Sequence, residues 1–405
     1  MTKRAGRLST FARAVGGVAT TMAVLVLVAA CGSSPAGTAA GGGTSTDATA
    51  HAGPHTSSPI AAAQPLRAGE WFLNLTVSKP YTPSPPNGGT DDYRCLVVDP
   101  RLTTPAFLTG TQFQPQNVPI VHHAIVFAIP PEQAAIARAK DDATGGQGWT
   151  CFGDTDLENQ QQQPAWVDSW TPGGTETLLQ QDVGFRLEPS SLLVLQVHYN
   201  LLATDGRPGG TDQSNVRLRL TEGTAATKPL DTLQLAAPIE LPCASRESGP
   251  LCDRTAAIAD VAQRFGAEVG DMEAHLVREC SNGTTVPGNT QHCDIPVPKP
   301  ITVYAAFGHM HLLGRSIKVE LNPGAAQART LLDVPSFNFD DQKLQPLPTP
   351  VDLNPGDTLR VTCTHDATLR RQLPALSKLP PRYVVWGDGS SDEMCLGLLT
   401  ATVGE

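Results

Sequence analysis

The sequence has few charges and no region suited to binding nucleic acid. Asp, Glu, Lys and Arg make up 17% of its 405 residues, and the formal net charge is −10. Outside the N-terminal segment there is no basic stripe or arginine cluster, so nucleic acid is not expected as a partner. The sequence also lacks a C-x-x-C pair and an internal repeat. The missing pair argues against a thiolate zinc site and a thioredoxin-type redox motif.

The sequence is rich in turn residues between short apolar runs. Hydrophobic residues make up 40% of the chain, and there are 37 Gly and 35 Pro. Runs such as EWFLNLTVS, SLLVLQVHYNLLA and DTLRVTCTHDA alternate with Pro, Gly, Asp and Asn turns, which is typical of antiparallel β-sandwiches. The length suits two lobes, and the turn-rich segment around 225–235 separates two strand-rich halves. We therefore predict an all-β fold with lobes at 67–228 and 229–405.

The main exception to the strand pattern lies between Cys252 and Cys280. Its apolar spacing and capping residues predict one or two helices. A cysteine stands at each end of this segment, which suggests a small helical insert clipped by a disulfide.

The N-terminal segment predicts an exported lipoprotein. Four basic residues precede the apolar run VGGVATTMAVLVLVAA, as in a signal peptide. The junction LVAAC resembles a bacterial lipobox, in which cleavage leaves Cys31 as a lipid-modified N-terminus; an ordinary secretory peptide or a short membrane helix is the alternative. Residues 32–66 are rich in Gly, Ser, Thr, Ala and Pro and predict a flexible tether. The expected location is the extracytoplasmic face of the cell membrane, with the lipid as the sole membrane contact.

Histidines occur in two close pairs, one in each half. Residues i and i+2 of a strand share a face, so His309 and His311 would direct both imidazoles to one side, with Met310 on the other. Adjacent His122 and His123 could bind one metal only if the backbone twists or bulges locally. Imidazole suits Zn, Cu, Fe or Ni, although such a pair also arises by chance as two surface or hydrogen-bonded histidines.

Two further residues extend these pairs. His198, in the apolar strand LLVLQVHYNLLA, could complete a three-imidazole site, although a lone histidine there is more often a core residue. Met394 follows an acidic turn and is expected to begin an apolar strand. Its thioether is a soft ligand that selects copper, particularly Cu(I), whereas an isolated methionine is more often core. The remaining histidines are expected to be structural or solvated: His51, His55, His275, His292 and His365.

Four short motifs, in order along the chain, are VHHAIVF, LQVHYN, HMHLLGR and SSDEMC. Together they resemble the copper type II, ascorbate-dependent monooxygenases, which include the peptidylglycine α-hydroxylating and dopamine β-monooxygenases. The resemblance spans about Trp71 to Val403 and implies two jelly-roll-like sandwich lobes, each holding one copper. It assigns an electron-relay copper to His122, His123 and His198, with Gln196 nearby. It assigns the oxygen-binding, catalytic copper to the remaining three ligands: His309, His311 and Met394.

The eight cysteines outside the lipobox are an even number, which in an exported protein predicts four disulfides. The resemblance pairs Cys363 with Cys395. The remaining cysteines permit several pairings, and the simplest nested set is Cys252–Cys280 clipping the helical insert, Cys243–Cys293 enclosing it, and Cys95–Cys151 in the first lobe.

The sequence departs from the peptide-amidating members of this family. They hold a terminal carboxylate with an arginine before the His-x-His pair and an asparagine and a tyrosine after the methionine motif. The corresponding residues here are Phe307, Leu396 and Leu398, so a small or apolar substrate is expected instead of a peptide.

The leading prediction is a monomeric, exported copper monooxygenase that uses two coppers, O2 and ascorbate or another reductant. One alternative is a copper-binding or storage lipoprotein without hydroxylase activity. Another is a structural surface sandwich whose histidines are vestigial.

Overall fold

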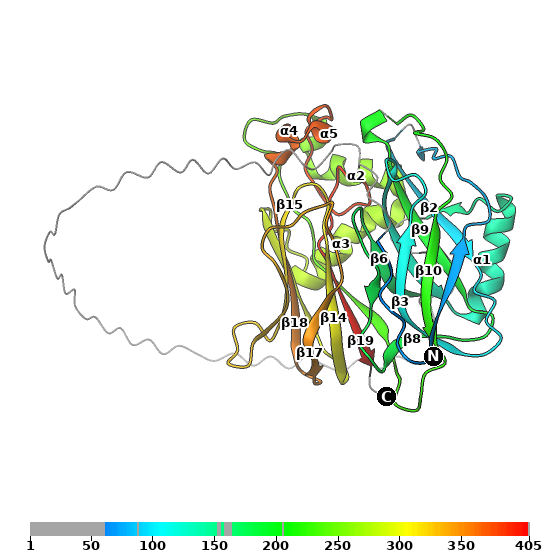
Figure 1. Ribbon diagram of the computed structural model, residues 1–405. Helices are drawn as coiled ribbons and strands as arrows, with labels where there is room; N and C mark the ends of the chain where they lie inside the picture. Colours follow the sequence, from blue (N-terminus) through cyan, green and yellow to red (C-terminus); the bar gives the residue numbers. More distant parts are fainter. Residues whose placement is uncertain (1–60, 87–88, 152–154, 158–163, 205, 404–405) are drawn as a thin grey trace, which may run out of the picture. The chain divides into compact units, whose positions relative to one another are not determined.

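Short runs rich in Val, Leu and Thr form nineteen strands in the computed structural model, which describes residues 61–86, 89–151, 155–157, 164–204 and 206–403. The leader, Cys31 and tether residues 32–60 lie outside the described residues. Among the described residues, no helix is both long and apolar enough to cross a membrane. The strands of the first half (blue to green) and those of the second half (green to red) form separate groups in Figure 1.

The first half of the chain forms two sheets, here called the first lobe. Its strands are β1 (Glu70–Thr76), β2 (Asp91–Val98), β3 (Ala106–Gln114), β4 (Val121–Ile129), β5 (Trp149–Thr150), β6 (Ala165–Trp170), β7 (Thr177–Leu178), β8 (Val183–Leu187), β9 (Leu192–Asn200), β10 (Asn215–Thr221) and β11 (Lys228–Pro229). One sheet has the order β1-β10-β3-β8-β11, with β7 beside β3; the other has the order β5-β2-β9-β4-β6. Pairing is antiparallel except between β8 and β11, which are parallel.

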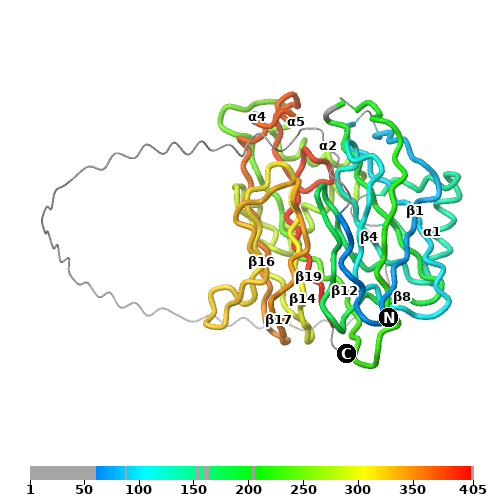
Figure 2. Tube along the Cα trace, in the orientation of Figure 1, coloured from blue at the N-terminus to red at the C-terminus, as the bar shows by residue number. Residues whose placement is uncertain are grey.

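The second half forms two four-stranded sheets, here called the second lobe. Its strands are β12 (Asp231–Ala236), β13 (Thr290–Pro296), β14 (Ile301–His309), β15 (Gly314–Leu321), β16 (Arg329–Val334), β17 (Gln345–Leu353), β18 (Thr358–His365) and β19 (Leu396–Val403). The sheet orders are β12-β19-β14-β17 and β13-β18-β15-β16. Figure 2 shows the red strand β19 running beside the green strand β12 and the yellow strand β14. The sandwich architecture predicted from turn spacing is confirmed.

The helices are few and short. They are α1 (Pro131–Ala143), α2 (Arg254–Phe265), α3 (Ala267–Ser281), α4 (Leu369–Gln372) and α5 (Pro374–Ser377), with 3-10 turns at Leu202–Thr204 and Pro250–Cys252. The predicted helical segment is therefore confirmed as two helices. Asp253 caps the start of α2 by accepting a hydrogen bond from the Ala256 N–H. Gly266, at φ 107°, separates α2 from α3 in a conformation that glycine adopts without strain.

Four disulfides are formed, and two of the predicted pairings are wrong. Cys95–Cys151 and Cys363–Cys395 are as predicted. Cys252 pairs with Cys243, and Cys280 pairs with Cys293, instead of Cys252–Cys280 and Cys243–Cys293. Both bridges close local loops of 9 and 13 residues, with Cα atoms 5.6 and 4.7 Å apart, within the range a disulfide spans. The helical insert is thus flanked by two short bridges, and no single bridge joins its ends.

The sheet that contains β4 and β9 is buried on both faces, which explains why these strands are apolar without alternation. On β4, Val126 packs into the core of the first lobe, whereas Ile125 and Phe127 pack into a core shared with the second lobe. On β9, Leu195 faces the first-lobe core and Val194 faces the shared core. Because the side-chain period of a strand is two, even-numbered residues of β9 face the second lobe.

A buried carboxylate in the first lobe predicts a pH-dependent stability. Asp168 on β6 is buried and accepts a hydrogen bond from the Thr111 hydroxyl on β3. Burial raises the pKa of Asp168 from 3.8 to about 6, against the opposing effect of hydrogen bonds from Thr111 and Thr177. The folded protein therefore binds a proton more tightly than the unfolded chain, so stability is greatest below pH 3.8 for this group and declines as pH rises through about 6.

Asp168→Asn is expected to remove this decline, which amounts to about 3 kcal/mol as an order of magnitude. Urea unfolding of both proteins between pH 4 and 7, in about half-unit steps, checks the expectation. An equal pH slope in the natural protein and in the Asn variant would assign the dependence to other groups.

Candidate metal centres

A β-bulge brings the adjacent histidines of β4 to one side. In the β4–β9 pairing, Val121 lies opposite Tyr199 and His123 lies opposite His198, so His122 is the extra residue. A bulge of this kind redirects a side chain that would otherwise point to the opposite face. The sequence showed that both rings could reach one metal only through a local twist or bulge, and a bulge is present. His198 is at an even position of β9 and so faces the second lobe.

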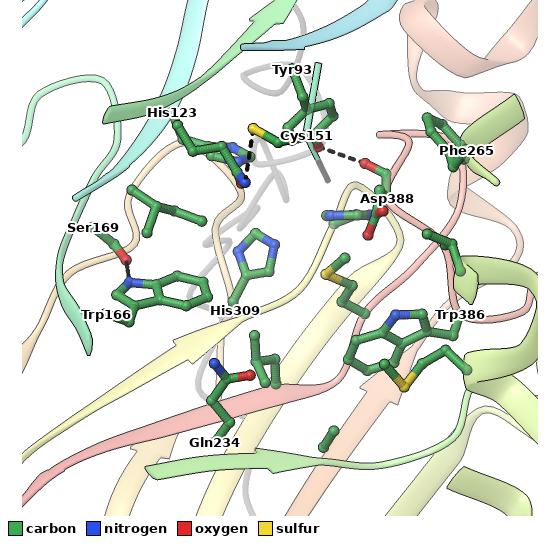
Figure 3. A pocket seen from close by; sticks show the side chains of 18 of the residues that line it. Tyr93, His123, Cys151, Trp166, Ser169, Gln234, Phe265, His309, Trp386 and Asp388 are labelled. Carbon is green, nitrogen blue, oxygen red and sulfur yellow. Dashed lines mark hydrogen bonds between the residues drawn. The ribbon is translucent and has the colours of Figure 1, made fainter. Parts of the chain in front are cut away.

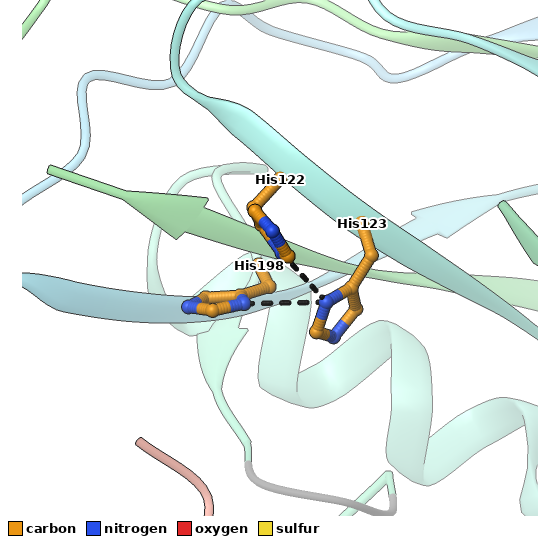
Figure 4. A group of neighbouring side chains, drawn as sticks. All are labelled: His122, His123 and His198. Atoms are coloured by element: carbon orange, nitrogen blue, oxygen red, sulfur yellow. Dashed lines mark hydrogen bonds between the residues drawn. The ribbon is translucent and has the colours of Figure 1, made fainter. Parts of the chain in front are cut away.

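The three first-lobe histidines converge. One nitrogen from each ring lies within 4.8 Å of the other two, and Figure 4 shows the rings meeting at a common point. Nδ1 of His123 is 3.1 Å from Nδ1 of His122 and 3.3 Å from Nδ1 of His198. All three side chains are buried. Three buried nitrogens at this spacing suit a single metal ion of the kind that imidazole prefers.

Asp91 and Tyr93 on β2 fix the orientation of His198. Nε2 of His198 lies 2.8 Å from Oδ1 of Asp91, so Nε2–H donates to the carboxylate and Nδ1 is left to bind a metal. The Tyr93 ring stacks on the imidazole with centroids 4.1 Å apart. Although burial raises it, the pKa of Asp91 is held below its ordinary value by hydrogen bonds from His198 and Ser390. Asp91 is therefore a charged partner for the ring.

His309 and His311 lie at the end of β14 and in the following turn. The prediction that both stand on one strand is wrong, because β14 ends at His309. The Glu393 carboxylate accepts the N–H of His311 at 2.9 Å and that of Leu313 at 2.6 Å, and these groups are thereby withdrawn from strand pairing. The two rings nevertheless remain close, with centroids 5.1 Å apart.

Met394 also lies outside a strand, two residues before β19 begins at Leu396. Leu396 pairs with His309, so Met394 approaches the end of β14. Met394, His309 and His311 line one cavity, and all three are buried. The Cys363–Cys395 disulfide ties the residue after Met394 to β18.

A segment of the second lobe, residues 337–343, contacts both histidine sets. Oε1 of Gln342 lies 2.7 Å from Nδ1 of His309, so Nδ1–H donates to the amide oxygen and Nε2 is left for a metal. The Phe339 ring stacks on His122 with centroids 4.1 Å apart. Thr171 of the first lobe donates its hydroxyl to the Gln342 carbonyl at 2.9 Å and accepts from the Gln342 N–H at 3.2 Å. This segment therefore links the two sets mechanically.

The two sets lie next to one another. The rings of His123 and His309 are 5.6 Å apart between centroids. Both line a cavity of about 550 Å3, and Figure 3 shows them together in it, with Trp166 and Trp386 also on the lining. Tyr93 closes one side by donating its hydroxyl to the Asp388 carbonyl at 2.6 Å.

The predicted neighbours of the metals are partly in this cavity. Gln196 lines it and points its Nε2 toward Sγ of Cys151 at 3.5 Å. Phe307 and Leu396 also line it, whereas Leu398 is buried in the core of the second lobe. All three residues are apolar, and two of them, Phe307 and Leu396, line the cavity.

Burial keeps His123, His309 and His311 neutral. It lowers the pKa of His123 well below its ordinary value, and the other histidines lower it further. Burial together with His311 lowers the pKa of His309 to about 3, and burial lowers the pKa of His311. A neutral imidazole has the free nitrogen lone pair that a metal ligand needs, so these rings are in the protonation state for binding.

Residues 279–400 match the family model for the copper type II ascorbate-dependent monooxygenase, C-terminal domain. The match lies within the second lobe, so this part of the chain is similar to the C-terminal domain of that family. The matched range contains His309, His311 and Met394, together with both cysteines of the Cys363–Cys395 bridge. The imidazole and thioether donors found in the second lobe fit the copper of this family.

Similarity of the chain to individual proteins is limited in extent. It is 33% identical over 101 residues to the human DBH-like monooxygenase protein 2, covering 25% of this chain and 18% of that protein. Among solved structures it is similar to the major capsid protein P2 of bacteriophage PM2, with 8% identity and a TM-score of 0.31. The similarity covers 83% of this chain and 98% of the capsid protein. The chain is also similar to an f-lectin from striped bass serum, with 7% identity and a TM-score of 0.17. This similarity covers 83% of this chain and 97% of the lectin. Scores this low bear on neither the fold nor the function of this chain.

Proposed function

We propose that the chain is a copper-dependent monooxygenase that hydroxylates a C–H bond of its substrate. The overall reaction is R–H + O2 + 2 e⁻ + 2 H⁺ → R–OH + H2O. The observation that carries the proposal is that two separate metal-ligand sets converge on one cavity, with the His123 and His309 rings 5.6 Å apart. A storage protein needs the ligands, but it does not need an apolar cavity beside them.

The ligand sets differ in chemistry, which suits different roles. The first-lobe set offers three imidazoles, from His122, His123 and His198. The second-lobe set offers two imidazoles, from His309 and His311, and the soft sulfur of Met394, which favours Cu(I). Copper bound in these sets would supply one-electron redox chemistry and activate O2. The protein's own contribution is orientation: Asp91 holds His198, and Gln342 holds His309.

The cavity favours an apolar substrate without a carboxylate. Its walls include aromatic side chains: Trp166, Trp170, Phe265, Phe307 and Trp386. The charged residues on the described part of its lining are three acids, Asp156, Glu268 and Asp388, with no lysine or arginine. A carboxylate entering this site would meet no compensating positive charge and would lose its hydration. We therefore propose a small apolar molecule as the substrate, together with O2.

Oxygen consumption tests the proposed function. The copper-loaded protein is expected to consume O2 when ascorbate or another one-electron reductant and an apolar C–H substrate are present, and ¹⁸O2 should label the product alcohol. Copper binding without reductant-dependent uptake would favour copper binding or storage instead.

Metal analysis tests the proposed copper count. We expect two coppers per chain in the natural protein, one in His198→Ala, and two in the control His292→Ala, which alters an exposed histidine on β13. A single copper in both the natural protein and His198→Ala would contradict the assignment of the first-lobe set.

We also propose that the protein acts as a lipid-anchored monomer on the extracytoplasmic face of the cell membrane. The support is the basic, apolar and small-residue pattern that ends at Cys31. Four disulfides in the described part of the chain are in keeping with an oxidising compartment. Release of Cys31→Ser from the membrane fraction would be the expected result.

A further inference from the structure

A second cavity, of about 620 Å3, lies in the second lobe around the ends of β15 and β18 and the short helix α4. None of its lining residues lines the cavity of the metal centres. Its described lining carries three arginines, Arg246, Arg315 and Arg371, against one carboxylate, Asp366. This is a local excess of positive charge in a chain whose formal charge is −10.

Asp366 neutralises only one of the three arginines. Its carboxylate accepts hydrogen bonds from the Thr368 N–H at 2.9 Å and the Thr368 hydroxyl at 2.6 Å, and from Arg315 at 3.2 Å. Among the described residues, the guanidinium groups of Arg246 and Arg371 have no ion-pair or hydrogen-bond partner. Both side chains are exposed at the cavity. Two unpaired guanidinium forks on one concave surface suit an oxyanion, because each fork presents parallel N–H donors.

His365 adds a buried polar group to the same lining. Its side chain is fully buried, and within the described chain neither Nδ1 nor Nε2 has a hydrogen-bond partner. Nε2 lies 3.3 Å from Oε2 of Glu393. With the ring proton on Nε2, which faces the Glu393 carboxylate without a hydrogen bond, Nδ1 is an acceptor. A buried acceptor without a partner is unfavourable, and a ligand hydroxyl would supply the missing hydrogen bond.

Glu393 connects this cavity to the segment that carries His311. The same carboxylate accepts the backbone N–H groups of His311 and Leu313 at 2.9 and 2.6 Å. A change in the hydrogen bonding of His365 therefore acts on a group that holds the turn between β14 and β15.

We propose that the second cavity binds a small oxyanion that also carries a hydroxyl group, for which hydrogen phosphate is the simplest probe. Arg246 and Arg371 bind its charged oxygens, and Nδ1 of His365 accepts its hydroxyl. Binding of the oxyanion changes the His311–Leu313 turn through the contacts of His365 and Glu393. The inference concerns the protein without copper and does not depend on the proposed function.

Calorimetric titration of the copper-free protein tests the binding. At pH 7.5 and constant ionic strength, inorganic phosphate is expected to bind saturably. Sulfate has no hydroxyl at this pH and is expected to bind at least about tenfold more weakly, because one hydrogen bond to a buried group is lost. The double variant Arg246→Ala/Arg371→Ala should lose phosphate binding. Arg329→Ala, which alters an exposed arginine on β16, should retain it. Equal binding by the double variant and the natural protein overturns the site, and equal affinity for phosphate and sulfate overturns the role of His365.

Amide chemical shifts test the connection to the turn. In protein labelled with ¹⁵N-leucine, the Leu313 amide signal should move with the same phosphate saturation as the calorimetric binding. His365→Leu, which keeps the two arginines, should abolish that movement and weaken phosphate binding severalfold. Saturable phosphate binding that leaves the Leu313 signal in place would refute transmission through Glu393.

Discussion

Met394→Leu is expected to lower reductant-dependent O2 consumption by more than about 100-fold, beyond the 10–100-fold typical of losing an outer-shell partner of a metal ligand. Leu replaces Met with nearly the same volume, so the fold and the first-lobe set should be retained. The loss is specific to the sulfur, which is the soft donor that favours Cu(I) beside His309 and His311.

Met310→Leu provides the matched control. Met310 is also a fully buried methionine, and it stands between the two second-lobe histidines, but it does not line the cavity of the metal centres. X-ray absorption of the reduced copper protein should show a sulfur scatterer in the natural protein and in Met310→Leu, and none in Met394→Leu. If sulfur is absent from the natural protein, Met394 is a core residue and this assignment fails.

Gln342→Ala is expected to lower activity by about 10–100-fold through the orientation of His309, which is the range seen when an outer-shell partner of a ligand is removed. Without the amide oxygen that accepts from Nδ1, the His309 ring can rotate or change tautomer, and Nε2 is no longer presented consistently. Copper affinity of the second-lobe set, measured by competition with a Cu(I) chelator, should fall in parallel.

Two further variants separate orientation from general stability. Gln342→Glu keeps an acceptor oxygen and should restore a substantial part of the Cu(I) affinity. Lys343→Ala alters an exposed side chain in the same segment and should behave as the natural protein. A Gln342→Ala variant with reduced thermal stability but unchanged Cu(I) affinity would show that Gln342 only supports the fold.

The candidate ligand residues were predicted from short motifs that resemble a known family, and the two histidine pairs also gave local signals. Adjacent His122 and His123 within an apolar strand require a bulge to act together, and the bulge is present. The two-residue side-chain period places His198 on the face toward the second lobe. The sandwich fold follows from short apolar runs at regular turn spacing, and the helical segment from its own periodicity.

The supporting residues were not predictable because their contacts join distant parts of the chain. Gln342 is 33 positions from His309, and Asp91 is 107 positions from His198. Glu393 ends β14 early because it accepts backbone N–H groups 80 and 82 residues away in the sequence. The sequence prediction therefore placed His311 on a strand, which is wrong. The Cys243–Cys252 bridge was not predicted for a different reason. An even count of cysteines does not distinguish a local bridge from a nested one.

The place of β19 in its sheet also determines when the second-lobe ligands can first meet. This strand pairs with β12 on one side and β14 on the other, and Met394 directly precedes the cysteine before it. The segments that form β12 and β14 are synthesised first. Each therefore keeps an unpaired edge until residues 396–403 have been synthesised and inserted between them. Assembly of His309, His311 and Met394 is therefore among the last events in the maturation of this lobe. Any metal that this set binds must therefore be delivered after insertion of the strand, and not during synthesis of the histidines.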